Sequence, residues 1–164
     1  MDWTKQLGRY IAVMLLQVLL FDQLQLLGVC HPYIYILCLL MMPITLPHSV
    51  DMIIGAIIGL VMDVFCNSLG IHTAACILLM FVRPYLIGAI VNDKDRLNEQ
   101  ISLHAIGMEA MLKYVILLVV LHHLTVFALG AWSWQHIGFV ILETLVSSTV
   151  TILVIMGYNV LRYK

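Results

Sequence analysis

The stretch that most constrains the fold is residues 46–91, in which two long apolar runs are joined by a short polar turn at 67–70. One face of the first run carries a small or polar residue at every fourth position: Gly55, Gly59, Asp63 and Asn67. A carboxylate in the middle of a bilayer costs about 2.5–3.5 kcal/mol or more, so this face is shielded from lipid. The spacing therefore predicts two membrane-spanning helices with a closely packed polar seam between protein elements.

The whole chain has the composition of a membrane protein. It is 63% hydrophobic and 10% charged, whereas a soluble domain is about 45–50% apolar and 25% charged. Its 164 residues suffice for about six spans of roughly 20 residues each. These numbers predict an all-α, polytopic bundle of about six transmembrane helices forming a single integral membrane domain. The net charge of -1 gives no basic field for nucleic acid.

Hydropathy divides the chain into six predicted spans: residues 9–27, 33–46, 50–66, 72–91, 111–129 and 136–158. The second is short and contains Pro43, so it either thins the bilayer locally or forms a re-entrant or kinked segment. Pro84 is expected to kink the fourth span. Between the fourth and fifth spans, residues 92–109 are charged and are predicted to form a cytoplasmic amphipathic segment ending near Gly107. A solvated helical connector is the other interpretation of that segment.

Basic residues predict the orientation. If the amino terminus is cytoplasmic and the chain crosses six times, seven of the eight basic residues lie on or beside the cytoplasmic face: Lys5, Arg9, Lys94, Arg96, Lys113, Arg162 and Lys164. The three turns then placed outside contain no Lys or Arg. We therefore expect both termini in the cytoplasm and an even number of crossings, either six or four if the second and third spans form a re-entrant pair.

The charged residues away from the ends of the predicted spans include Asp22, Asp63, Arg83 and Glu143. Counting about 1.5 Å per residue places the three acids in the outer half of the bilayer. Arg83 lies deeper, at the level of Asp51, which is its expected partner. Three interpretations stay open for the acids: interhelical hydrogen bonds and caps, with Asp63 bonding to the turn at 67–72; a polar anchor for a partner helix; or a path for protons or ions.

Motifs for catalysis and cofactor binding are not found. Nucleophile elbows, phosphate loops and metalloprotease or dinucleotide fingerprints are missing, and the four cysteines lack metal-ligand spacing. His122 and His123 are adjacent, so they point about 100° apart on a helix and do not converge on one metal. We therefore assign no catalytic, cofactor-binding or metal-binding residues. The missing motifs weaken an enzymatic interpretation without excluding an intramembrane enzyme, which would need two or more ionisable residues at one depth.

Residues 46–85 resemble the rod shape-determining protein MreD family. The resemblance lies in a glycine-containing helix that ends in an acid, a short turn, and a Leu-Gly pair followed by a His: here Gly55, Gly59, Asp63, Asn67, Ser68, Leu69, Gly70 and His72. Outside residues 46–91 the similarity is one of hydropathy and length. The resemblance implies a non-enzymatic scaffold in the inner membrane that takes part in cell shape and in regulating peptidoglycan synthesis.

The same resemblance implies partners. Proteins of this family associate with the bitopic protein MreC and, through it, with MreB, RodA and a class B penicillin-binding protein. Helix-packing or partner-binding candidates are then Gly55, Gly59, Asp63, Asn67, Gly70 and His72, together with the loop at 92–109. The glycine groove is equally suited to packing within the chain.

A second function remains open because the family is similar in topology to the substrate-binding S components of energy-coupling-factor vitamin transporters. A transport subunit would use the buried polar groups, including Asp22, Arg83 and Glu143, as part of a ligand site. It would also need an outward-facing pocket. The predicted outer turns offer Trp132, Trp134 and His136 for such a pocket.

Overall fold

The structure is a computed structural model that describes residues 3–21, 30–91, 101, 103–131 and 137–163. All regular elements in these residues are helices, in the order α1 (Trp3–Leu16), η1 (Gln17–Phe21), α2 (Ile36–Leu40), α3 (His48–Cys66), α4 (Ile71–Ile90), α5 (Leu103–Gly130) and α6 (Ile137–Tyr163). The prediction of an all-helical fold is thus confirmed over the described residues.

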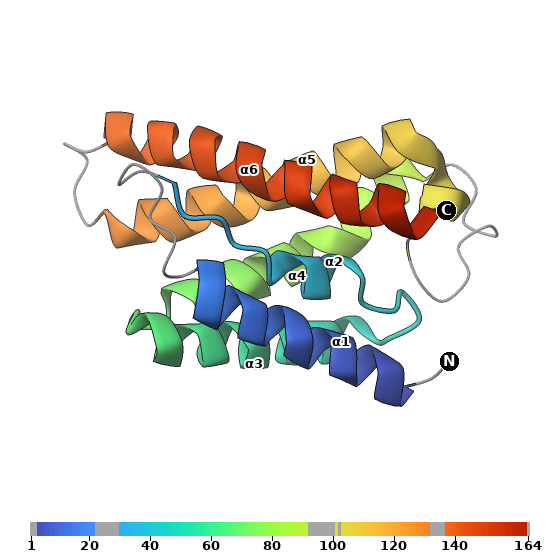
Figure 1. Cartoon of the computed structure of the whole chain (residues 1–164), viewed down its shortest axis with the longest axis horizontal. Coiled ribbons are helices and arrows are strands. Elements are labelled where there is room, and N and C mark those ends of the chain that lie inside the picture. The colour runs from blue at the N-terminus through green and yellow to red at the C-terminus, as the bar shows by residue number, and fades with distance from the viewer. Residues whose placement is uncertain (1–2, 22–29, 92–100, 102, 132–136, 164) are drawn as a thin grey trace.

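Helices α3, α4, α5 and α6 are each long and apolar enough to cross a membrane. They pack in sequence order, with α3 against α4, α4 against α5 and α5 against α6. Figure 1 shows that α1 begins and α6 ends at the same end of the molecule, which is called the terminal end below. The other end, where α3 ends and α4 begins, is called the turn end.

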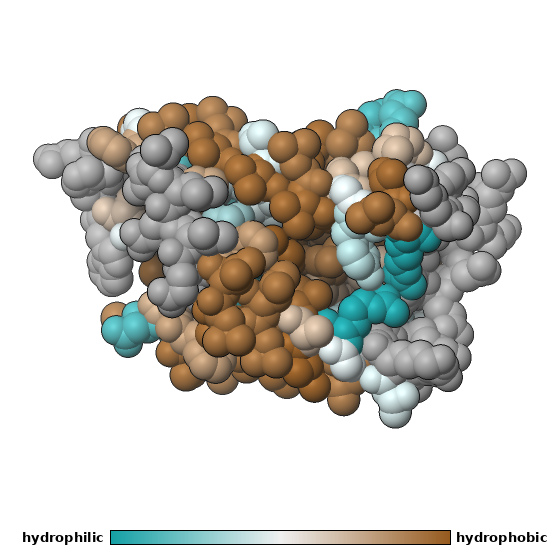
Figure 2. Space-filling model, in the orientation of Figure 1, coloured by the Kyte–Doolittle hydropathy of each residue, from teal (hydrophilic) through white to brown (hydrophobic). Residues whose placement is uncertain are grey.

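Apolar side chains cover the middle of the surface (Figure 2), as expected where lipid is the solvent. On α3 the exposed residues include Ile53, Ile57 and Leu60, whereas Gly55, Gly59 and Asp63 on the opposite face are buried. The polar side of this helix therefore faces protein and the apolar side faces outward. Hydrophilic side chains in Figure 2 gather toward the terminal end.

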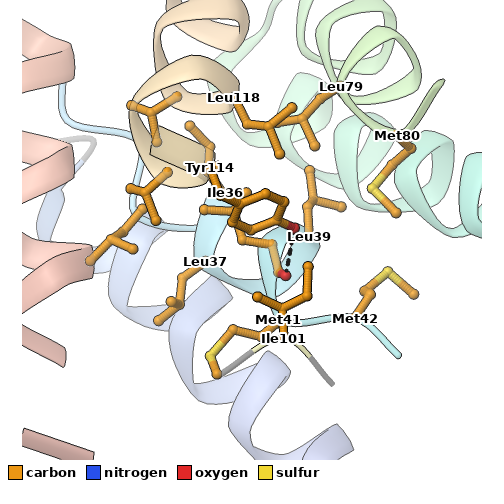
Figure 3. Packing of buried hydrophobic residues seen from close by; sticks show 14 of the residues in the cluster. Ile36, Leu37, Leu39, Met41, Met42, Leu79, Met80, Ile101, Tyr114 and Leu118 are labelled. Atoms are coloured by element: carbon orange, nitrogen blue, oxygen red, sulfur yellow. Dashed lines mark hydrogen bonds between the residues drawn. The ribbon is translucent and has the colours of Figure 1, made fainter. Parts of the chain in front are cut away.

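Residues 30–46 form an irregular segment that lies inside the bundle, and we call them the buried segment. Within it, all residues from Ile34 to Met42 are buried, yet only the five residues of α2 are helical. The segment runs between α1, α4 and α6 (Figure 1). Its side chains form much of the core, where Ile36 and Leu39 pack with Leu79 and Leu118 (Figure 3).

The observed helices differ from the predicted spans at several places. A helix filling the second span, 33–46, is not observed. Pro32 and Pro43 flank the stretch, and the N–H groups of Tyr33 and Ile34 bond to side chains of other elements. Helix α5 begins at Leu103, eight residues before the predicted start at 111, and its backbone is non-helical at Gly107 (φ 79°). The first span, 9–27, is described only up to Phe21, and most of the loop at 92–109 also lies outside the described residues.

Candidate functional site

The glycine face of α3 packs against α4. A Cβ atom built on Gly59 would lie 2.5 Å from the Cα of Thr73 and 2.8 Å from the carbonyl oxygen of His72. One built on Gly55 would lie 2.7 Å from Cγ of Met80. Real Cβ atoms do not approach backbone this closely, so the contact between the two helices depends on glycine at position 59.

Asp63 lies one turn beyond Gly59 on the same face, and it caps the amino terminus of α4. Its carboxylate accepts hydrogen bonds from the backbone N–H groups of His72 and Thr73, both at 2.9 Å, and from the hydroxyls of Ser68 and Thr73, both at 2.6 Å. The first N–H groups of a helix have no partner within it and carry its positive dipole end. An acid from the preceding helix therefore satisfies them.

The turn between α3 and α4 brings the start of α4 within hydrogen-bonding distance of Asp63. Asn67 closes α3 in the left-handed conformation (φ 52°), and Gly70 adopts φ 87° just before α4 begins. These two positive φ values reverse the chain within four residues, so that the first turn of α4 comes back beside the end of α3. The sequence-predicted residues Gly59, Asp63, Asn67, Gly70 and His72 are thus brought together at one end of the bundle.

A second polar network holds the buried segment near the turn end. The side-chain oxygen of Gln17 accepts hydrogen bonds from the N–H groups of Ile34 (2.6 Å) and Tyr35 (3.3 Å), and its amide nitrogen donates to the carbonyl of Pro32 (3.2 Å). On the other side, hydroxyls of α6 accept bonds from two further N–H groups: His31 to Ser147 (2.9 Å) and Tyr33 to Thr151 (3.2 Å). Two polar side chains of α6 therefore bond to irregular backbone.

Arg83 holds the buried segment near its other end. Its guanidinium forms an ion pair with Asp51 (3.2 Å), donates to the hydroxyl of Tyr114 (2.9 Å) and donates to the carbonyl of Met42. Tyr114 in turn donates to the carbonyl of Leu40 (3.0 Å), the dashed bond in Figure 3. The expected pairing of Arg83 with Asp51 is confirmed. The network also joins the buried segment to α3, α4 and α5.

Histidines and tyrosines gather between these two networks. The hydroxyl of Tyr35 lies 3.1 Å from Nδ1 of His72 and 2.7 Å from Nε2 of His122. The ring of Tyr33 contacts the rings of His72, His122 and His123, at centroid distances of 5.1, 5.8 and 5.1 Å. His122 and His123 are both fully buried. In the part of the chain that the structure describes, no group of three or more His, Cys, Asp or Glu residues is arranged to hold a metal ion.

An open cavity of about 770 Å³ lies at the turn end, next to the cluster of histidines and tyrosines. Residues of η1, α3, α4, α5 and α6 contribute to its wall, and the segment around Pro32 contributes as well. Glu143 of α6 and His72 of α4 both line it. Of the three acids predicted for this half of the bundle, Asp63 and Glu143 are found at this end, and Asp22 lies outside the described residues.

Several residues of the site were not singled out from the sequence. Gln17, Tyr35 and Tyr114 each bond to the buried segment or to the histidines, although their partners are 15 to 87 positions away. The one available signal was the position of Gln17, an amide within an otherwise apolar run.

Comparisons with known proteins give one match. A protein-family model described as rod shape-determining protein MreD matches residues 7–163. No curated protein and no solved structure is similar enough to the chain to count as a match.

Proposed function

The chain belongs to the family of rod shape-determining proteins called MreD, and we propose that it acts as a non-enzymatic scaffold of the cell-elongation machinery. In this proposal it resides in the cell inner membrane, with both termini in the cytoplasm. It contributes to rod shape and to the regulation of peptidoglycan synthesis. The observation that carries the proposal is the family match over residues 7–163, together with four apolar helices of membrane-spanning length.

The proposed direct partner is an MreC-like bitopic protein, through which MreB, RodA and a class B penicillin-binding protein are reached. A scaffold of this kind needs apolar surface for helix packing in the membrane. Such surface is abundant, because α3 alone exposes Ile53, Ile57, Leu60 and Val64. Association in lipid rests on close packing and interhelical hydrogen bonds, because the apolar tails give helices no hydrophobic drive to associate.

The position of the partner contact is also a proposal. Gly55 and Gly59 pack against α4 in the same chain, so a partner helix at the glycine groove would have to displace α4. We therefore favour the outward face of α3 for the partner helix. The charged residues at 92–109 are the proposed cytoplasmic contact.

Co-purification from mild detergent tests the function directly. We expect a bitopic coiled-coil protein and cell-wall synthases to accompany the tagged chain. An Ile57→Trp substitution on the outward face of α3 should reduce this co-purification, whereas Leu153→Trp on the outward face of α6 serves as the matched control. Recovery of two ATPases with a coupling membrane subunit would contradict the scaffold.

The cavity at the turn end favours a second candidate, the substrate-binding S-type subunit of an energy-coupling-factor vitamin transporter. Its volume of about 770 Å³ lies within the range of small-molecule sites, roughly 300–1,000 Å³. Deleting the gene separates the two functions. Loss of rod shape with unchanged vitamin uptake supports the scaffold, and loss of uptake of one vitamin supports transport.

A further inference from the structure

The cavity at the turn end has a wall of aromatic rings. Phenylalanines and one tyrosine from five parts of the chain contribute to it: Phe21, Tyr33, Phe65, Phe127 and Phe139. Tyr33 is fixed in place, because its ring packs against Tyr35, Phe127 and three histidines. Aromatic faces carry partial negative charge and attract cations.

Glu143 gives the same wall a carboxylate. Its side chain is partly buried, and it makes no hydrogen bond and no ion pair within the described part of the chain. The other acid at this end, Asp63, differs because four donors surround it. A partly desolvated carboxylate that none of the described residues neutralises favours binding of a positive charge.

Lysine and arginine are missing from the cavity wall, and its two histidines are His31 and His72. Neither Lys nor Arg occurs in the adjoining sequence at 22–29 or 132–136. An anionic ligand would therefore meet Glu143 without a counter-charge. The cavity is also a poor site for inorganic cations. Hard cations prefer six or more oxygen ligands, and no group of three or more His, Cys, Asp or Glu residues that could hold a metal ion is found among the described residues.

We propose that this cavity binds a small organic cation with an apolar body, with its positive charge at Glu143 and its body against the aromatic wall. A ligand of this class gains ion pairing and cation–π contact together, in a space large enough for it. Apart from Phe65 and Cys66 at the end of α3, the lining residues lie outside α3, which carries the proposed partner surface, so the proposal does not depend on the scaffold role.

The test uses benzyltrimethylammonium as the probe and the full chain in nanodiscs of zwitterionic lipid. Equilibrium dialysis against empty nanodiscs should show saturable binding of one probe per chain. Phenylacetate, an anion of similar size, and neutral benzyl alcohol should bind at least about tenfold more weakly, because each lacks the charge-assisted contact. Equal binding of either molecule would overturn the proposal, and so would no saturable binding of the cation.

Two pairs of variants locate the site. Glu143→Gln should weaken binding about tenfold, while Glu109→Gln should leave it unchanged, because Glu109 lies about 25 Å further along α5 from the cavity residue Val126. Phe139→Leu should weaken binding about two- to fivefold through loss of one aromatic face, and Phe81→Leu on α4 is its control. Both phenylalanines are exposed, so these variants are expected to fold. Equal effects within either pair would contradict the assignment.

Discussion

Helices α3 and α4 form a hairpin over residues 48–90. The backbone N–H and C=O groups of this hairpin and those of the buried segment find their hydrogen-bond partners in opposite ways. In the hairpin, helices satisfy their own backbone groups, and Asp63 completes the bonding at the start of α4. In the buried segment, only five residues are helical, and side chains of η1 and of α4 to α6 complete the bonding of its backbone. Irregular backbone at membrane depth is tolerated where protein surrounds it.

The difference lies in the distance along the chain between bonded groups. Asp63 bonds to residues five to ten positions away, whereas the N–H of Tyr33 bonds to a hydroxyl 118 positions away. The hairpin is thus determined largely by its own sequence. The buried segment is determined by residues that the rest of the bundle brings to it.

Replacing Arg83 should have the largest effect and tests whether the buried segment depends on distant side chains. Arg83→Met leaves the Asp51 carboxylate buried without its cation and frees the carbonyl of Met42. We expect the free energy of unfolding to fall by about 3–5 kcal/mol, measured by unfolding in mixed micelles of denaturing and mild detergent. Lys113→Met, at an exposed ion pair, should change it by less than about 1 kcal/mol. Equal losses would contradict the dependence.

Filling the helix contact should break the hairpin. Gly59→Ala places a methyl group 2.5 Å from the Cα of Thr73, so α3 and α4 must separate. The expected loss in free energy of unfolding is about 2–3 kcal/mol. Gly138→Ala in α6 is the matched control, because a Cβ there meets nothing within 4 Å. A stability of Gly59→Ala equal to that of the control would show that the contact is not close.

Removing the side-chain amide of Gln17 tests whether the buried segment depends on η1. Gln17→Leu leaves the buried N–H groups of Ile34 and Tyr35 without their acceptor, and we expect a loss of about 2 kcal/mol. Hydrogen exchange should accelerate at these two amides and remain slow in α4. Thr149→Val, which removes an exposed hydroxyl bonded within its own helix, is the control. Unchanged exchange at Ile34 would exclude this role for Gln17.

The cap at Asp63 should have the smallest effect of the four, because it is local. Asp63→Asn keeps one carbonyl oxygen near the N–H groups of His72 and Thr73 but loses the charge at the helix terminus. We expect a loss of about 1 kcal/mol, with Asp63→Ala losing more. Faster exchange should be confined to the first turn of α4. Acceleration throughout the buried segment would mean that the two regions are not separable.

Sequence patterns predicted the hairpin well. Four-residue spacing put Gly55, Gly59 and Asp63 on one face, and the polar turn at 67–70 marked the reversal. These features are local, so the sequence contains them in readable order. The pairing of Arg83 with Asp51 also followed from depth alone, because both lie on helices whose rise is known.

Neither the irregular form of the buried segment nor the cavity could be predicted from the sequence, and the reason is the same for both. An apolar run such as 33–42 has the composition of a helix, and its irregular form depends on Gln17, Ser147 and Thr151 meeting it in space. Pro43 showed only that a full helix was unsuitable. The cavity wall combines residues from five of the seven helical elements and from the buried segment, so it exists only once the bundle has formed.

The bonding of the buried segment has a consequence for biogenesis. The residues that accept from His31 and Tyr33 belong to α6, 116 and 118 positions further along the chain, so they are synthesised much later. Until α6 is inserted, these backbone N–H groups either bond to water or lie in hydrocarbon without an acceptor. We therefore expect the second crossing to settle after the rest of the chain has entered the bilayer, and nascent chains halted before Ser147 to leave residues 30–35 accessible to aqueous thiol or protease probes.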